Sequence, residues 1–282
     1  MTDNGYVKPQ VLIETSEVAA RLNERTLRLI EVDVDATAYD QGHLAGAVGW
    51  DWQAHLQRRP VRDIPSRSEW ETLLGRSGIG NDAAVVLYGD NNNWFAAFAY
   101  WLFKLYGHDD VRLMNGGRKK WIGEGRLLTT AISACPATIY RAKEPDDSLR
   151  ALRDDVWETL GRDGWALVDV RSPGEFSGEL LAPENLPQEG AQRGGHIPGA
   201  RNIPWSTAVA EDGSFKPRAE LVQIYGGAGV AATREVIAYC RIGERSAHTW
   251  FVLHELLGYP WVRNYDGSWT EWGSLVGAPI ER

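Results

Sequence analysis

Residues 236–246 read VIAYCRIGERS, and residues 247–258 continue the chain as AHTWFVLHELLG. A short apolar run ends at Cys240, a polar loop follows, and apolar residues then recur at the spacing of one helix face. The pattern predicts a strand, a loop and a helix, with Ser246 as the N-cap and Gly258 as the left-handed residue that ends the helix. Cys240 is therefore expected at the end of a strand, facing the first turn of a helix.

This position favours an anionic sulfur. Helix N-terminal amides and the positive end of the helix dipole stabilise an anion, so we expect the pKa of the Cys240 thiol to lie below its ordinary value of about 8.5. Arg241 and Arg245 add two positive charges to the loop. The loop amides of three residues form a candidate anion cradle: Ile242, Gly243 and Glu244. A buried cysteine that only fills space is the alternative, but such a residue needs no polar loop with two arginines.

Length, charge and cysteine content limit the possible functions. The 282 residues are enough for two domains, each with its own core. A formal net charge of -8 gives no overall attraction to nucleic acid or to anionic membranes, so neither is expected as a partner. The first residues lack the pattern of a signal peptide and no apolar run is long enough to span a bilayer, so we expect a cytoplasmic protein.

The sequence predicts neither a metal site nor a cofactor. Its two cysteines, Cys135 and Cys240, are too few for a disulfide framework, and the six histidines are scattered. The candidate for a phosphate-binding loop, residues 115–119, lacks the spacing and the Ser or Thr of a P-loop.

The order of predicted elements occurs twice along the chain. In each half a strand ending in acidic residues precedes a Gly-rich turn, and a second strand precedes a helix; the paired segments are 27–34 and 165–170, 39–47 and 195–200, and 83–107 and 236–258. The register holds without a gap in four pairs of residues offset by 151 positions: Tyr88 and Tyr239, Gly107 and Gly258, Gly116 and Gly267, and Trp121 and Trp272. The chain therefore contains an internal duplication.

Strands that alternate with helices predict an α/β fold, in which each half forms a mainly parallel sheet with helices on both faces. Residues 1–126 are predicted to form the first domain, residues 127–147 a linker of weak periodicity, and residues 148–282 the second domain. Ligands of such sheets bind beyond the carboxyl ends of the strands, which is where Cys240 falls.

The two halves differ at the expected site. Gly89 stands at the position of Cys240 in the first half, and Asp33 stands at the position of Arg171. Only the second half is therefore expected to carry a functional site. It also contains an extra stretch, residues 177–194, which is rich in Pro, Gly and acids and either borders the site or is a solvated insertion.

These features together resemble the tandem-domain rhodanese family, the thiosulfate sulfurtransferases. The resemblance rests on the duplicated halves, the paired Gly-His-x-x-Gly-Ala turns, the Cys-Arg-x-Gly loop and the closing segment 262–272, and it covers nearly the whole chain. The first turn departs from the pattern, with Ala45 where the second has Pro198. The resemblance implies two rhodanese-like domains, of which the first is a non-catalytic partner.

The resemblance also implies roles for individual residues. Cys240 is the expected nucleophile, which takes sulfur from thiosulfate as a persulfide and passes it to cyanide or thiols. Many members have a lysine two residues after the cysteine; Ile242 stands there, so we expect Arg245 to supply the charge. Asp169 is expected to be a structural hydrogen-bonding partner. The candidate substrate-binding residues are Arg171, Arg241 and Arg245, and the alternative for Arg171 is a surface residue in a turn.

Three alternatives remain. 3-Mercaptopyruvate sulfurtransferase resembles this scaffold but commonly has a glycine where Arg241 stands. Cysteine-dependent phosphatases and arsenate reductases have five residues between cysteine and arginine, whereas four lie between Cys240 and Arg245. The third class is a non-enzymatic sulfur-carrier or scaffolding protein; an intact cysteine between two arginines argues against it, because a scaffold needs neither. The sequence does not predict the oligomeric state.

Replacing Cys240 with Ser is expected to abolish sulfur transfer while leaving the fold intact, because only this cysteine lies at a strand-to-helix loop. Cys135→Ser, the matched control in the predicted linker, should keep near wild-type activity. Assays of both variants with thiosulfate and cyanide measure the effect, and equal losses in the two variants would contradict the assignment.

Overall fold

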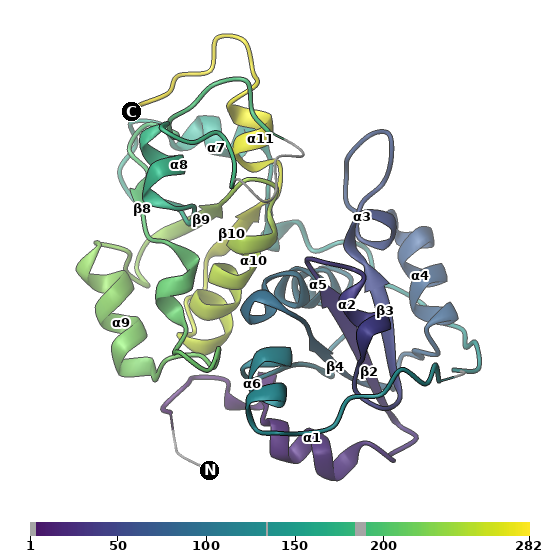
Figure 1. Cartoon of the computed structure of the whole chain (residues 1–282). Coiled ribbons are helices and arrows are strands. Elements are labelled where there is room, and N and C mark those ends of the chain that lie inside the picture. Colours follow the sequence, from purple (N-terminus) through teal and green to yellow (C-terminus); the bar gives the residue numbers. More distant parts are fainter. Residues whose placement is uncertain (1–3, 134, 184–189) are drawn as a thin grey trace. The chain divides into compact units, whose positions relative to one another are not determined.

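The computed structural model describes residues 4–133, 135–183 and 190–282 (Figure 1). By its internal contacts the chain divides into two compact units. The Cys240 unit comprises residues 1–9, 147–208 and 216–282, and the Gly89 unit comprises residues 10–146 and 209–215. The sequence-based division into residues 1–126, a linker and residues 148–282 stays a prediction.

Each unit is built on a five-stranded sheet whose neighbouring strands are parallel. The strand order is β1-β5-β4-β2-β3 in the Gly89 unit and β6-β10-β9-β7-β8 in the Cys240 unit, so the two sheets share one topology. The strands of the first sheet are β1 (Leu12–Ile13), β2 (Leu27–Asp33), β3 (Ala47–Asp51), β4 (Ala84–Tyr88) and β5 (Val111–Met114). Those of the second sheet are β6 (Arg150–Ala151), β7 (Trp165–Asp169), β8 (Arg201–Asn202), β9 (Glu235–Tyr239) and β10 (Val262–Tyr265).

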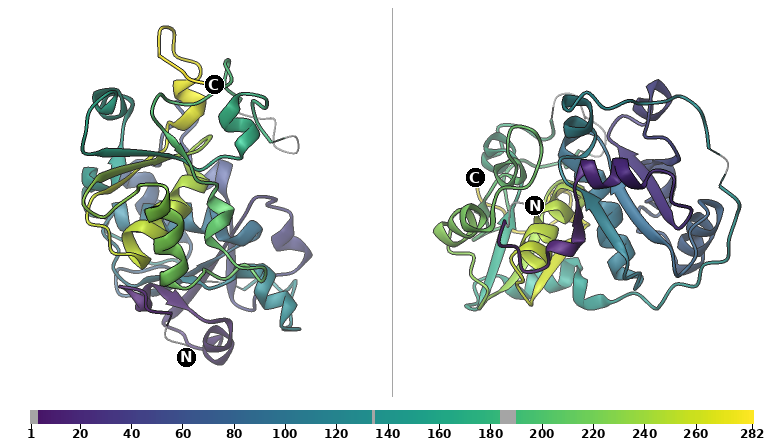
Figure 2. Two further views of the ribbon diagram at one scale, coloured as in Figure 1. Left: turned by 90° about the vertical axis from the view of Figure 1, so that its left-hand side faces the viewer. Right: turned by 90° about the horizontal axis from the view of Figure 1, so that it is seen from below.

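Helices surround each sheet, as the views in Figures 1 and 2 show, and the predicted fold of two tandem parallel α/β domains is confirmed. The Gly89 unit contains α1 (Thr15–Arg21), α2 (Ala38–Gln41), α3 (Trp52–His55), α4 (Arg67–Arg76), α5 (Trp94–Leu105) and α6 (Gly117–Gly123). The Cys240 unit contains α7 (Arg153–Thr159), α8 (Pro173–Ser177), α9 (Arg218–Gly227), α10 (Glu244–Trp250), the π-helix η5 (Phe251–Leu256) and α11 (Ser268–Trp272). Short 3-10 helices are η1 (Pro9–Val11), η2 (Asn91–Asn93), η3 (Asp147–Leu149) and η4 (Trp205–Ala208).

The helix after Cys240 begins earlier than predicted. Gly243 caps α10 in the left-handed region, with φ of +99°, and the helix starts at Glu244. The prediction of Ser246 as the N-cap is therefore wrong, because the glycine turns the chain into the helix directly after the loop. Ser246 lies inside the helix and donates its hydroxyl to Asn264 Oδ1 at 2.6 Å.

The end of this helix matches the prediction. The chain continues from α10 into the π-helix η5, and Gly258 follows with φ of +73°. The Tyr259 amide then donates to the Leu253 carbonyl at 2.9 Å, one position further back than in a Schellman motif, as expected after a π-helix. The N-terminal segment packs here: the Val7 amide donates to the Leu256 carbonyl at 2.9 Å, and a Cβ on Gly258 would lie 2.8 Å from Val7.

Side chains alternate along β9, so this strand contributes to both faces of its sheet. On one face, Tyr239 belongs to a buried core with Tyr265 of β10 and with Trp269 and Trp272 of α11. On the other, α10 packs along the strands, and its Trp250 donates the indole N–H to the Val262 carbonyl at 2.9 Å. The loop at Cys240 is thus held between two packed layers.

Candidate active site

Cys240 directly follows β9, the middle strand of its sheet. The last residue of β9, Tyr239, pairs with Asp169 of β7 and with Tyr265 of β10. The cysteine therefore lies at the carboxyl end of the sheet, as predicted, and its side chain is fully buried.

The sulfur has hydrogen-bond partners on the loop and at the start of α10. The Gly243 amide donates a hydrogen bond to Cys240 Sγ at 3.2 Å, and the thiol donates to Glu244 Oε2, also at 3.2 Å. Glu244 is itself buried. The sequence indicated these two residues for their loop amides only, so the carboxylate of Glu244 on the sulfur was not foreseen.

The segment that opens α11 fixes the backbone of the cysteine. The Cys240 amide donates to Ser268 Oγ at 3.1 Å, and this hydroxyl donates to the Tyr265 carbonyl at 2.6 Å. The amides of Trp269 and Thr270 donate to the carbonyls of Cys240 and Arg241, each at 3.0 Å. The first turn of α11 therefore holds the loop in position from outside.

The pKa of the Cys240 thiol is raised, which corrects the expectation of a lowered value. Burial is the largest cause, and the negative charge of Glu244 and its hydrogen bond act in the same direction. The positive charge of Arg245 and a backbone hydrogen bond from Ser246 lower the pKa but do not outweigh these effects. Reasoning from the sequence counted the arginines and the helix amides but missed the desolvation and the carboxylate.

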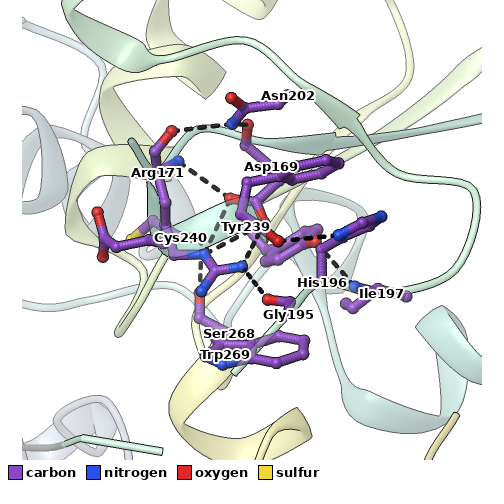
Figure 3. A network of polar contacts seen from close by, with 12 residues as sticks. Asp169, Arg171, Gly195, His196, Ile197, Asn202, Tyr239, Cys240, Ser268 and Trp269 are labelled. Carbon is purple, nitrogen blue, oxygen red and sulfur yellow. Dashed lines mark hydrogen bonds and ion pairs between the residues drawn. The ribbon is translucent and has the colours of Figure 1, made fainter. Parts of the chain in front are cut away.

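Arg171 is completely buried in an ion pair with Asp169 (Figure 3). Its Nε lies 3.0 Å from Asp169 Oδ1, and its Nη2 lies 2.6 Å from Oδ2 and 2.7 Å from the Gly195 carbonyl oxygen. The guanidinium carbon is 4.6 Å from the ring centre of Trp269. Nη1 is buried and has no hydrogen-bond partner among the described residues. Asp169 therefore has the structural role predicted for it, and one donor of Arg171 remains available.

Arg245 forms a second buried ion pair, with Glu175 of α8. Its Nη1 and Nη2 donate to the two carboxylate oxygens at 2.9 Å each, and its Nε lies 3.6 Å from Glu244 Oε1. Glu175 also accepts from the amide and the hydroxyl of Ser172, the N-cap of α8. Burial favours the neutral carboxyl group, but the bonds and charge of Arg245 prevail and lower the pKa of Glu175 to about 2. No sequence pattern indicated this pair, whose members are 70 positions apart.

The remaining predicted loop residues, Arg241 and Ile242, are also buried. His248 of α10 is fully buried against Trp205, with ring centres 5.2 Å apart, and burial lowers its pKa to about 3. The imidazole is therefore neutral at physiological pH and contributes no charge to the site.

The described part of the stretch 177–194 supports the same loop. The indole N–H of Trp269 donates to the Arg193 carbonyl at 2.9 Å, and the Arg193 guanidinium donates to the carbonyls that end α11, among them Trp272 at 3.1 Å and Gly273 at 3.1 Å. Residues 184–189 of this stretch lie outside the described residues. Its C-terminal end therefore acts as a brace for α11.

The equivalent place in the Gly89 unit has different chemistry. Gly89 leaves no room for a side chain, because a Cβ there would lie 2.1 Å from the Val32 carbonyl oxygen. Asn93, 151 positions before Glu244, accepts from the Gly89 amide at 2.9 Å. Arg118, 151 positions before Trp269, forms an ion pair with Glu31. The loop of this unit is thus held by polar side chains of the unit itself.

Metal binding has no support in the part of the chain that the structure describes. Within those residues, no group of three or more His, Cys, Asp or Glu side chains is arranged to hold a metal ion. Over the same residues, no helix has the length and apolar character needed to cross a membrane.

Comparisons with known proteins identify the family to which this chain belongs. Residues 14–124 and 152–275 each match the rhodanese-like domain family. A protein of Saccharopolyspora erythraea with the name "Putative thiosulfate sulfurtransferase" is 58% identical over 274 residues, which are 97% of each chain. "Sulfur carrier protein TtuD" of Thermus thermophilus is 53% identical over 281 residues, or 99% of each chain.

A solved structure is similar in fold at lower identity. The anaerobic ergothioneine biosynthesis enzyme from Chlorobium limicola, in complex with trimethyl histidine, matches with a TM-score of 0.81 and 25% identity. The match covers 96% of this chain and 70% of the other.

Replacing Glu175 with Gln is expected to lower the free energy of unfolding by about 3–5 kcal/mol at neutral pH, because Arg245 then stays buried without its counter-charge. The pKa of Glu175 is depressed in the fold, so the stabilisation is present above the ordinary carboxyl value of 4.5 and is lost as the pH falls towards about 2. Urea unfolding at several pH values measures both effects. The exposed Glu235→Gln is the matched control, and a difference from wild type that persists unchanged to pH 2 contradicts the assignment.

Proposed function

Because this chain belongs to the rhodanese family and is a sulfurtransferase, we propose that it takes the outer sulfur of thiosulfate onto Cys240 and passes it to cyanide or another thiophilic acceptor. The observation that carries the proposal is the buried sulfur of Cys240 at the carboxyl end of β9, within reach of the Gly243 amide and next to two arginine–carboxylate pairs. We infer from these groups that the site receives a sulfur atom together with an anion.

The proposed reaction consists of two displacements. In the first, the Cys240 sulfur attacks the outer sulfur of thiosulfate, the bond between the two thiosulfate sulfurs breaks, and its electron pair leaves with sulfite. In the second, the acceptor attacks the outer sulfur of the persulfide, and the electron pair of the broken bond returns to Cys240. Splitting the transfer through a covalent intermediate gives ping-pong kinetics.

The loop residues have distinct roles in this scheme. The Gly243 amide stabilises negative charge on the cysteine sulfur. Arg245 acts through its fixed positive charge, since both of its Nη atoms already donate to Glu175. Arg171 is the proposed contact to the anion, through the buried Nη1 that Asp169 leaves without a partner. A direct contact of Arg241 to substrate stays a prediction.

We propose thiosulfate, rather than mercaptopyruvate, as the sulfur donor. A dianion gains more than a monocarboxylate from the extra positive charge at Arg241, where mercaptopyruvate sulfurtransferases commonly have a glycine. Several relatives with more than 50% identity carry thiosulfate sulfurtransferase in their names, which supports the same donor.

Intact-protein mass spectrometry tests the proposed function directly. Wild-type protein treated with thiosulfate should become heavier by one sulfur atom, and cyanide should remove that atom; Cys240→Ser should stay unmodified. Steady-state rates with thiosulfate and with mercaptopyruvate then establish the donor. An unchanged mass after thiosulfate, together with hydrolysis of an aryl phosphate by the wild type, would favour a phosphatase instead.

Replacing Arg171 with Lys tests the anion contact without leaving Asp169 unpaired. The variant keeps a positive charge but loses the Nη1 donor, so kcat/KM for thiosulfate should fall by about 10-fold or more, the loss of a charge-assisted hydrogen bond of about 1.5–3 kcal/mol. Arg263→Lys is the matched control, because Arg263 also pairs with an aspartate and lies over a tryptophan ring. Wild-type kcat/KM in Arg171→Lys excludes this contact.

A further inference from the structure

We propose that Glu244 is a catalytic residue, which takes the proton of the Cys240 thiol when sulfur is loaded and returns it when the persulfide is consumed. The proposal rests on the proposed function and adds to it the proton transfer that the thiol requires. It applies to the resting state, in which Cys240 carries a proton.

The geometry places one carboxylate on the reacting atom. Glu244 Oε2 accepts from Cys240 Sγ at 3.2 Å, within hydrogen-bond reach for a proton transfer, and both side chains are buried. Glu244 is the first residue of α10, directly after the Gly243 cap, so the helix start fixes its backbone. Water has no access to the thiol here, and the proton therefore needs an acceptor within the protein.

The other charged groups around Glu244 form ion pairs of their own. Arg245 Nε lies 3.6 Å from Glu244 Oε1, and its other nitrogens bind Glu175 of α8. Asp266, which lies against Gly243, is paired with Arg150 through two contacts of 2.8 and 2.9 Å.

Within the part of the chain that the structure describes, the neighbouring elements supply no second acceptor. Asp169 of β7 is bound to Arg171, and His248 of α10 is neutral and deeply buried. Among the described residues, Glu244 is the carboxylate that the structure places on the sulfur.

Electrostatics determine where this proton lies in the resting state. The charge of Glu244 keeps the thiol protonated in the resting state, since it raises the pKa of Cys240. Transfer of the proton to Glu244 Oε2 leaves the net charge of the pair unchanged and moves its negative charge onto the sulfur, where the Gly243 amide donates and the positive charge of Arg245 acts. The nucleophile is thus produced by a proton shift inside the buried pair.

Both half-reactions balance with this single proton. In loading, the S–H proton moves to Glu244 Oε2, a bond forms between Cys240 Sγ and the outer sulfur of thiosulfate, and sulfite leaves with the electron pair of the broken S–S bond. In unloading, cyanide attacks that outer sulfur, thiocyanate leaves, and Cys240 Sγ recovers both an electron pair and the proton from Glu244. The protein returns to its initial state without any other reactant.

The duplicated unit supplies an internal comparison. Asn93 stands at the position of Glu244, and its side-chain oxygen accepts from the Gly89 amide at 2.9 Å. The unit without a cysteine has an amide at this position, which accepts no proton at physiological pH. Within this chain the carboxylate thus accompanies the nucleophile.

The pH dependence of sulfur loading tests the proposal. Rapid mixing with thiosulfate, followed by quenching and mass spectrometry, gives the loading rate of the wild type, which should be nearly constant between about pH 6 and 8 because the proton acceptor is internal. Glu244→Gln should load about 100-fold more slowly at pH 7, and its rate should rise about tenfold per pH unit because loading then depends on the deprotonated fraction of the thiol. Glu244→Asp should restore part of the rate and the flat profile.

The outcomes separate this proposal from the proposed function. Glu235→Gln, which removes an exposed carboxylate from the same unit, should behave as wild type. Two results would show that Glu244 is only a hydrogen-bond partner: a wild-type loading rate that rises about tenfold per pH unit, or a flat pH profile in Glu244→Gln whatever its absolute rate. In either case this proposal fails, while persulfide formation stands. If the wild type takes up no sulfur at all, the proposed function fails and this inference fails with it.

Discussion

The complete burial of the Cys240 thiol is the constraint on which the rest of the site depends. Water cannot stabilise a charge on this sulfur, so the protonation state of the thiol depends on the protein groups that lie next to it. Gly243 offers one amide, Glu244 offers one carboxylate, and Arg245 contributes a positive charge. A solvated cysteine would need none of these groups to be held so closely.

The buried arginines near the sulfur are paired with carboxylates, which offset the free-energy cost of burying the positive charge. An unpaired buried guanidinium costs several kcal/mol in desolvation, whereas a bidentate pair recovers much of that cost. Asp169 holds Arg171 at the end of β7, and Glu175 holds Arg245 from the first turn of α8. These pairs also connect the loop to two neighbouring elements, so the positions of the charges and the packing of the loop depend on one another.

Sequence patterns predicted much of this architecture. Apolar runs and the 151-residue repeat identified the strands, the duplication and the place of Cys240, and left-handed Gly258 ended its helix as expected. The Arg245–Glu175 pair was not predictable, because it joins residues 70 positions apart whose proximity exists only in the folded sheet. The predicted direction of the shift in the Cys240 pKa was wrong for a related reason. Burial and side-chain rotamers decide this shift, and neither is visible in a sequence.

The close approach of Gly89 to Val32 limits which residues can stand at position 89. A Cβ at Gly89 would lie 2.1 Å from the Val32 carbonyl oxygen, and the loop beyond it passes through three consecutive asparagines with positive φ. A cysteine placed at Gly89 would therefore meet a backbone that leaves no space for it. One substitution does not give the Gly89 unit the thiol of the Cys240 unit, because the neighbouring strand would have to move as well.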